Sequence, residues 1–214
     1  MAHSFIKYTT AQNEYDQWSL NEPITKIMGL NAPSLNSKER EFIKLANPTK
    51  ILDIGCGNGE RLFSYLSAMK IPFLGIEKYG RLIEQSNFKD FILVEDLLQL
   101  NASNIDKRFE NIDVITILGG SLIGMFCYKN QQNAWNKIMG LLPTGGRIIF
   151  DTFMINGFET IDFIGTTRLF PSAPPQYLLS EKQLKALWNE LNLEIIKTSD
   201  LERPPIRYYL LKKK

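Results

Sequence analysis

Short apolar runs alternate with helical patterns along most of the chain. The runs suited to strands are Ile51–Ile54, Phe73–Glu77, Phe91–Val94, Asp113–Leu118, Arg147–Asp151, Leu193–Lys197 and Arg207–Leu211. Apolar residues recur at helical spacing in Glu39–Leu45, Glu60–Met69, Arg81–Ser86, Lys129–Leu141 and Glu181–Asn192. Strands that alternate with helices predict a parallel sheet with crossover helices.

The last two strands are predicted to form a hairpin at the end of this sheet. They are close in sequence, and Pro204-Pro205 blocks a helix between them. Before them, Ser180 and Gln183 have the spacing of a capping box for the helix that begins at Glu181.

The first strand runs directly into a turn with three alternating glycines, in the decamer Ile51-Leu52-Asp53-Ile54-Gly55-Cys56-Gly57-Asn58-Gly59-Glu60. Glycines at this density let the chain turn with positive φ and let a ligand touch the backbone. A strand, a glycine turn and a helix N-terminus together form a cofactor cradle in open α/β folds.

The glycine spacing disfavours a dinucleotide. The dinucleotide fingerprint is G-x-G-x-x-G, whereas the third glycine here, Gly59, comes one residue early and Glu60 follows it. A carboxylate on the first helical turn would repel a pyrophosphate, and Asp53 adds a second acid near the turn. These acids favour a ligand that carries positive charge and no phosphate.

The decamer resembles motif I of the class I S-adenosylmethionine (SAM)-dependent methyltransferases, over a region of about Lys50 to Lys214. The resemblance implies an α/β fold of three layers, doubly wound around a mostly parallel seven-stranded sheet. It implies the strand order 3-2-1-4-5-7-6 with the last strand antiparallel. It also implies SAM as cofactor and S-adenosylhomocysteine (SAH) as product.

Further acids follow the next strands at matching positions. Glu77 ends the second strand 18 residues after Gly59 (77 − 59), where an acid binds the ribose hydroxyls in Rossmann-like folds. Asp96 and Leu97 follow the third strand and resemble the residues that contact adenine, and the backbone near Leu118 and Gly119 is a candidate for the ammonium group. The expected cofactor residues are Asp53, Gly55, Cys56, Gly57, Gly59, Glu77, Lys78, Asp96, Leu97, Leu118 and Gly119. The structural alternatives are an exposed strand-end glutamate at 77 and a helix N-cap at Asp96.

Methyl transfer from a sulfonium requires alignment more than elaborate catalytic groups, because the leaving group is already activated. Asp151, at the end of the fifth strand, is a candidate for orienting an acceptor or removing its proton. Tyr15 is a candidate for an aromatic wall beside a cation. The alternatives are a loop-capping acid at 151 and ordinary core packing at Tyr15.

Two segments lie outside the predicted core. We expect residues 1–49 to form an N-terminal cap or lid, and residues 50–214 to form the SAM-binding domain with a substrate-side insertion at about 152–179. A connection as long as this insertion is usually functional or disordered.

The composition of the chain indicates which kinds of partner to expect. The 214 residues carry a net charge of +2, which gives no global attraction to nucleic acid. The two cysteines, Cys56 and Cys127, are too few for a zinc or disulfide framework, so no metal is expected. The N-terminus shows no signal-peptide pattern, and no apolar stretch reaches the roughly 18 residues of a membrane span. We expect a cytoplasmic protein, a monomer or homodimer, that does not bind membranes and whose acceptor is a small molecule in preference to a nucleic acid.

The sequence thus predicts a SAM-dependent methyltransferase that transfers a methyl group to a small-molecule N or O acceptor. One alternative keeps the cofactor but changes the acceptor to tRNA or a protein side chain. Another is a catalytically silent binding protein with the same fold. A dehydrogenase is disfavoured by the glycine spacing and by Glu60.

Overall fold

The structure is a computed structural model. It describes residues 34–100, 107, 110–119, 128–155, 157–162, 165–167, 176–202 and 205–214. Tyr15 and most of the expected N-terminal cap lie outside these residues. Among the helices described here, none has the length and apolar character needed to cross a lipid bilayer.

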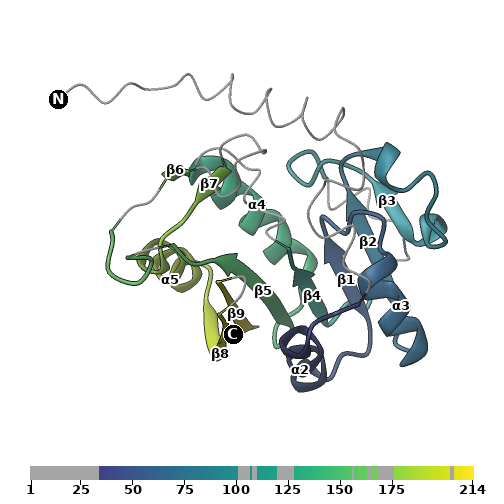
Figure 1. The fold of residues 1–214 in the computed structure, drawn as a ribbon, viewed down its shortest axis with the longest axis horizontal. Coiled ribbons are helices and arrows are strands. Elements are labelled where there is room, and N and C mark those ends of the chain that lie inside the picture. Colours follow the sequence, from purple (N-terminus) through teal and green to yellow (C-terminus); the bar gives the residue numbers. More distant parts are fainter. Residues whose placement is uncertain are drawn as a thin grey trace.

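A seven-stranded sheet forms the centre of the fold, in the order β3-β2-β1-β4-β5-β9-β8 (Figure 1). Its strands are β1 (Ile51–Ile54), β2 (Phe73–Glu77), β3 (Ile92–Val94), β4 (Val114–Ile117), β5 (Arg147–Phe153), β8 (Leu193–Leu201) and β9 (Ile206–Lys213). The first five are parallel, and β9 runs antiparallel to both β5 and β8. Counting only the strands of this sheet, the order is 3-2-1-4-5-7-6, which confirms the prediction.

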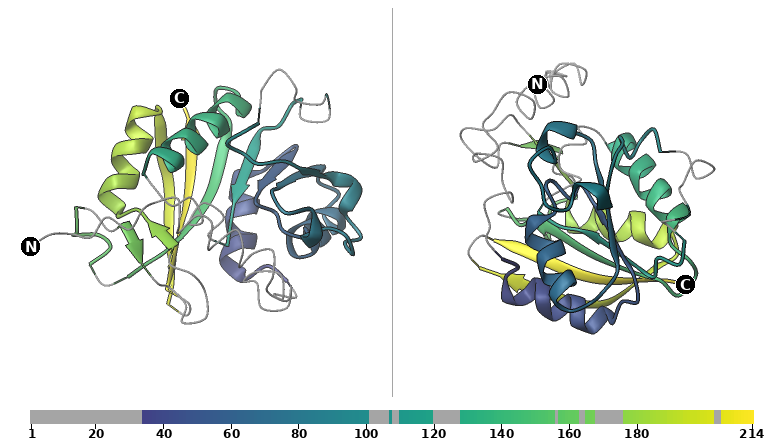
Figure 2. Two further views of the ribbon diagram at one scale, coloured as in Figure 1. Left: turned by 90° about the horizontal axis from the view of Figure 1, so that it is seen from above. Right: turned by 90° about the vertical axis from the view of Figure 1, so that its right-hand side faces the viewer.

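Helices cover both faces of the sheet, as Figure 2 shows. They are α2 (Ser37–Ala46), α3 (Glu60–Ala68), α4 (Tyr128–Leu141) and α5 (Glu181–Glu190). Alternate strand residues point to opposite faces. Leu52 and Ile115 therefore pack with α4 and α5 in one core cluster, while Ile51 and Val114 pack with α2 and α3 in the other. The three layers expected from the sequence are present.

The predicted helix at Arg81–Ser86 is wrong. A single 3₁₀ turn, Gly80–Leu82, stands there. The Ser86 hydroxyl instead donates to the Asn58 carbonyl at 2.6 Å and accepts from the Phe88 amide at 2.9 Å. These bonds tie the segment to the glycine turn, and they replace a helix too short to be stable by itself.

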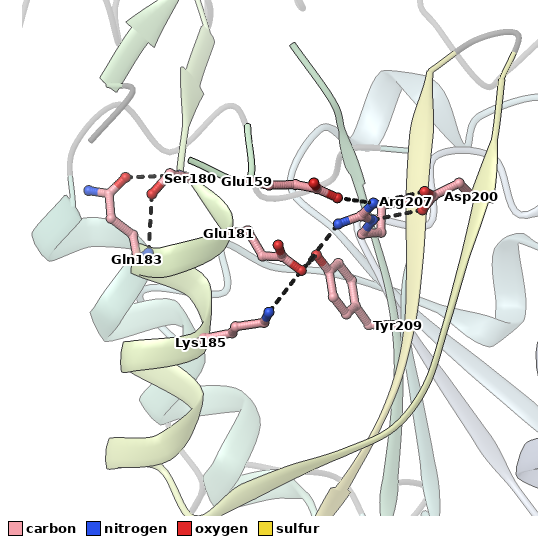
Figure 3. A network of polar contacts seen from close by, with 8 residues as sticks. All are labelled: Glu159, Ser180, Glu181, Gln183, Lys185, Asp200, Arg207 and Tyr209. Carbon is pink, nitrogen blue, oxygen red and sulfur yellow. Dashed lines mark hydrogen bonds and ion pairs between the residues drawn. The ribbon is translucent and has the colours of Figure 1, made fainter. Parts of the chain in front are cut away.

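The long connection after β5 contains two short strands that the sequence did not predict. β6 (Gly165–Thr167) and β7 (Gln176–Leu178) pair as a separate antiparallel sheet. The chain then enters α5 through the predicted capping box, in which the Ser180 hydroxyl accepts from the Gln183 amide and the Gln183 side chain accepts from the Ser180 amide (Figure 3).

Arg207 of β9 joins three parts of the chain at this end of the sheet (Figure 3). Its guanidinium donates to both oxygens of Asp200 on β8, at 2.7 and 2.8 Å. It also pairs with Glu181 at the start of α5 and with Glu159, which follows β5. The Arg207 side chain is 13% exposed. Its positive charge therefore offsets the repulsion between three carboxylates at a largely buried position.

We predict that Arg207→Met lowers the free energy of unfolding by about 2 kcal/mol, because it leaves three acids without their shared partner. Urea denaturation followed by circular dichroism measures this change. The matched control is Lys185→Met, which removes a half-exposed cation from Glu181 and should cost less than about 1 kcal/mol. Equal losses in the two variants would contradict the central role of Arg207.

Candidate functional site

The glycine turn after β1 has the backbone that its sequence predicts. Gly55, Gly57 and Gly59 have φ values of 67°, 58° and 72°, in the region that side chains disfavour. At Gly59 a Cβ atom would lie 2.5 Å from the Phe63 ring. The turn can therefore pack against α3 only with glycine at this position.

Cys56 fixes the turn against the neighbouring strand. A Cβ atom on Gly75 of β2 would lie 2.5 Å from the Cys56 sulfur, so the thiol occupies the space that this glycine leaves. Burial raises the pKa of the Cys56 thiol well above its ordinary value. The Cys56 side chain is therefore a neutral group that packs in the core. If Cys56 contacts a ligand, the contact is made by its backbone.

Glu77, at the end of β2, is bonded directly to the glycine turn. It is 6% exposed, and its carboxylate accepts from the Gly57 amide at 2.9 Å and the Tyr79 amide at 3.0 Å. Burial raises the pKa of Glu77, and these bonds oppose that rise. The alternative of an exposed strand-end glutamate is wrong, because this carboxylate is buried beside the turn.

Asp53, the acid of β1, is also buried, at 6% exposure. The Thr116 hydroxyl on β4 donates to it at 2.7 Å. Burial raises the pKa of Asp53 from 3.8 to about 7; the Thr116 bond and the nearby Arg61 cation lower it, and Glu39 and Glu77 raise it. Burial of the charged form of Asp53 is therefore unfavourable, and a positive charge nearby would stabilise that form.

Asp96 and Leu97 follow β3 as expected, but both already have local contacts. One Asp96 oxygen accepts from the Leu98 amide at 2.9 Å, and the other lies 3.5 Å from the Lys78 ammonium. The first bond closes a local turn, but no helix begins at Asp96 among the described residues 96–100, so the alternative of a helix N-cap is wrong. Leu97 is 5% exposed and belongs to the core. Contact of either residue with adenine stays a prediction.

Asp151, two residues before the carboxyl end of β5, is bonded to the turn after β4. It is 3% exposed and accepts from the Gly119 amide at 2.9 Å. Gly119 itself has a φ of 69°, and Leu118 before it is buried. Asp151 thus has the structural role proposed as its alternative, and its catalytic role stays a prediction.

A polar network from α2 reaches the same edge, and the sequence analysis missed it. The Arg61 guanidinium donates to Glu39 at 2.8 Å. The side-chain amide of Asn36 donates to the Tyr208 hydroxyl, also at 2.8 Å. Glu39 is 1% exposed and Tyr208 is fully buried, and burial raises the pKa of Tyr208. The position of Arg61 directly after the glycine turn was the available signal.

The carboxyl edge of the sheet is therefore rich in buried acid. Four buried carboxylates lie around the turns after β1 and β4, namely Glu39, Asp53, Glu77 and Asp151. Each accepts a hydrogen bond from another element of the fold. Such an arrangement favours a cationic ligand and disfavours a phosphate.

Comparisons with known proteins agree with this geometry. No protein-family model matches the sequence. Over 106 residues the chain is 42% identical to the ribosomal RNA small subunit methyltransferase A of Mycoplasma genitalium, a match that covers 46% of this chain and 36% of that protein. The chain thus spans about a third of the length of this relative.

Solved structures match over much more of the chain. A SAM-dependent methyltransferase from Clostridium acetobutylicum has a TM-score of 0.64 at 14% identity, over 96% of this chain and 98% of that one. The glycopeptide N-methyltransferase MtfA complexed with SAH has a TM-score of 0.64 at 12% identity, over 83% and 89% of the two chains. The chain has the Rossmann-like fold of the class I SAM-dependent methyltransferases.

Proposed function

We propose that this protein is a SAM-dependent methyltransferase that transfers a methyl group to a nitrogen or oxygen of a small molecule. The observation that carries the proposal is the buried Glu77 carboxylate bonded to the Gly57 amide. It places an acid against a glycine turn at the carboxyl edge of the sheet, where ligands bind in doubly wound folds.

The residues present fit this cofactor in charge and in backbone shape. Gly55, Gly57 and Gly59 carry no side chain and adopt positive φ values, so a ligand can approach the backbone of the turn at these positions. The buried acids Asp53 and Glu77 suit a ligand with a sulfonium and an ammonium group. An acid at the end of the second strand also occurs in dinucleotide sites. The preference over a dehydrogenase therefore rests on the glycine spacing and on Glu60 in the first turn of α3, where a carboxylate would repel a pyrophosphate.

When bound, SAM supplies a methyl group already activated on a sulfonium. In this proposal Glu77 accepts hydrogen bonds from the ribose hydroxyls, because a carboxylate can take both hydroxyls of a cis-diol. Asp96 and Leu97 hold the adenine, and the backbone at Leu118 and Gly119 holds the ammonium. The remaining expected cofactor residues, Cys56 and Lys78, flank the turn and Glu77.

On the acceptor side, the protein orients a nucleophile in line with the methyl group and excludes water. An amine that arrives neutral needs no base, whereas a hydroxyl must lose its proton. Asp151, near the carboxyl end of β5, is the acid that can hold this proton, and Tyr15 supplies an aromatic face. We expect residues 1–49 and the insertion at about 152–179 to cover the acceptor.

Two observations support a small acceptor. Solved structures with this fold include a glycopeptide N-methyltransferase and an amino pentose methyltransferase. The segment after β4 reads Leu118-Gly119-Gly120-Ser121. It lacks the Asn/Asp-Pro-Pro-Tyr/Phe signature of enzymes that methylate exocyclic amines of nucleic acids.

An RNA acceptor is the second candidate, because the relative from Mycoplasma genitalium is a ribosomal RNA methyltransferase. Transfer of tritiated methyl groups from SAM to total RNA and to a small-metabolite extract separates the two. We expect label in the small-molecule fraction. Label that appears in RNA, and disappears with Asp53→Ala, would favour the RNA acceptor instead.

The proposal predicts SAH binding that depends on Glu77. We expect the wild-type protein to bind SAH with micromolar affinity in titration calorimetry. Glu77→Gln should weaken binding at least about tenfold, because hydrogen bonds to a charged group contribute about 1.5–3 kcal/mol. Glu84→Gln, at an exposed position, is the matched control and should bind like wild type. No binding of SAH or SAM to the wild-type protein would refute the proposal.

The buried Asp53 also makes the free energy of unfolding depend on pH. An acid whose pKa is higher in the folded state, about 7 against 3.8, makes folding less favourable as the pH rises between these values. Asp53→Asn removes this loss. We therefore expect the variant to be more stable than wild type at pH 8 by about 2–4 kcal/mol, and the difference to shrink toward pH 4.

Urea denaturation at several pH values measures this difference, with Glu84→Gln as the control for a change of charge. A variant that is less stable than wild type at pH 8 would contradict the inferred cost of burying Asp53.

A further inference from the structure

One row of residues crosses the sheet just inside its carboxyl edge. The strand register aligns Gly75 of β2, Asp53 of β1 and Thr116 of β4, and the row continues to Ile149 of β5 and Leu210 of β9. Residues in such a row project from the same face of the sheet. Of the two cross-strand neighbours of Asp53, one is a glycine. Thr116 is therefore the cross-strand neighbour whose side chain can hydrogen-bond to this acid.

The Thr116 hydroxyl has two acceptors within reach. It donates to Oδ1 of Asp53 at 2.7 Å, and it lies 3.5 Å from the carbonyl oxygen of Leu52. Thr116 is fully buried and Asp53 is 6% exposed, so the bond between them is shielded from bulk water. A hydroxyl both donates and accepts, whereas a carboxyl group donates only when it is protonated.

This arrangement satisfies Asp53 in both of its ionisation states. When Asp53 is ionised, the Thr116 hydroxyl donates to the carboxylate. When Asp53 is protonated, its own proton can be donated to the Thr116 oxygen, and the hydroxyl can then turn toward Leu52. Neither state leaves a buried donor without an acceptor, which would otherwise be unfavourable.

Other groups near Asp53 also affect its ionisation. The titratable and charged groups around it come from α2, α3, β2 and the glycine turn, and they are Glu39, Arg61, Glu77 and Cys56. Burial is the largest influence and raises the pKa of Asp53, and the bond from Thr116 is the largest influence that lowers it. The hydroxyl therefore opposes burial more strongly than the nearby arginine does.

We infer that Thr116 is a positioning residue of the cofactor site, which lets Asp53 change its ionisation state when a cationic ligand binds or leaves. This inference rests on the proposed function and deepens it. Without the ligand and at low pH, the Asp53 carboxyl group keeps its proton and donates it to Thr116. As the cation binds, this proton leaves to solvent, and the Thr116 hydroxyl reverses and donates to the carboxylate. Thr116 thereby sets the lowest pH at which the site binds a cation tightly.

Removal of the hydroxyl tests this role. Thr116→Val keeps the shape of the side chain without its hydroxyl, whereas Thr116→Ser keeps the hydroxyl. Ile149→Val, in the same row, is the matched control for lost packing. Titration calorimetry with SAM from about pH 5 to about pH 9 gives the midpoint at which affinity falls. The ionisation of SAM itself is common to all the proteins, so differences between variants report on the protein.

The ionised form of Asp53 binds the cation, so wild-type affinity should fall as the pH decreases through the pKa of this acid. Thr116→Val removes a donor to the ionised form and raises that pKa. We therefore expect its midpoint to move up by about one pH unit, with an affinity that approaches wild type at the highest pH. Thr116→Ser and Ile149→Val should keep the wild-type midpoint. In an Asp53→Asn background, Thr116→Val should cause no further shift.

An unchanged midpoint in Thr116→Val, or a loss of affinity that is equal at every pH, would overturn the inference alone. If this variant does not fold, carbon NMR of the wild-type protein tests the same point. The Asp53 carboxyl carbon and the Thr116 β carbon should titrate together, at a lower pH with SAM than without it. A Thr116 signal that does not follow Asp53 would overturn the inference. A wild-type protein that binds neither SAM nor SAH at any pH would overturn the proposed function as well.

Discussion

Burial of carboxylates at the carboxyl edge of the sheet is the constraint on which this site depends. Glu77 and Asp151 are held by backbone amides, of Gly57 and Gly119 respectively, and Asp53 is held by the Thr116 hydroxyl. Each bond joins two elements, so the bonds that satisfy the acids also fix the turns after β1 and β4. Burial nonetheless leaves the pKa of Asp53 at about 7, which is the electrostatic reason for expecting a cation here.

Much of the fold was predictable because its signals are local. β1 and β2 have the predicted bounds, since each is a short apolar run that ends beside a turn or an acid. The capping box at Ser180 and the hairpin of β8 and β9 follow from neighbouring residues in the same way. The helix predicted at Arg81–Ser86 failed because the bonds of Ser86 to the glycine turn compete with it.

The rest of the site could not be read from local patterns. Glu39 lies three residues after Asn36 and closes the capping box of α2, which is a local pattern. Its ion pair with Arg61, 22 residues away, is a contact that no local pattern predicts. The network of Arg207 likewise joins Glu159, Glu181 and Asp200 from three separate segments. Interactions of this kind depend on how distant segments are arranged in the fold. They join the segment after β5 and α2 to the sheet edge that carries the predicted cofactor residues.

The most direct test of the buried-acid site is the proton balance of ligand binding. Calorimetric titration of SAM at pH 7, in buffers with different ionisation enthalpies, counts the protons released per molecule bound. A cation beside Asp53 lowers the pKa of this acid, so wild type should release a fraction of a proton and Asp53→Asn should release measurably less. Tight binding with the same proton balance in both proteins would contradict a cationic ligand beside Asp53.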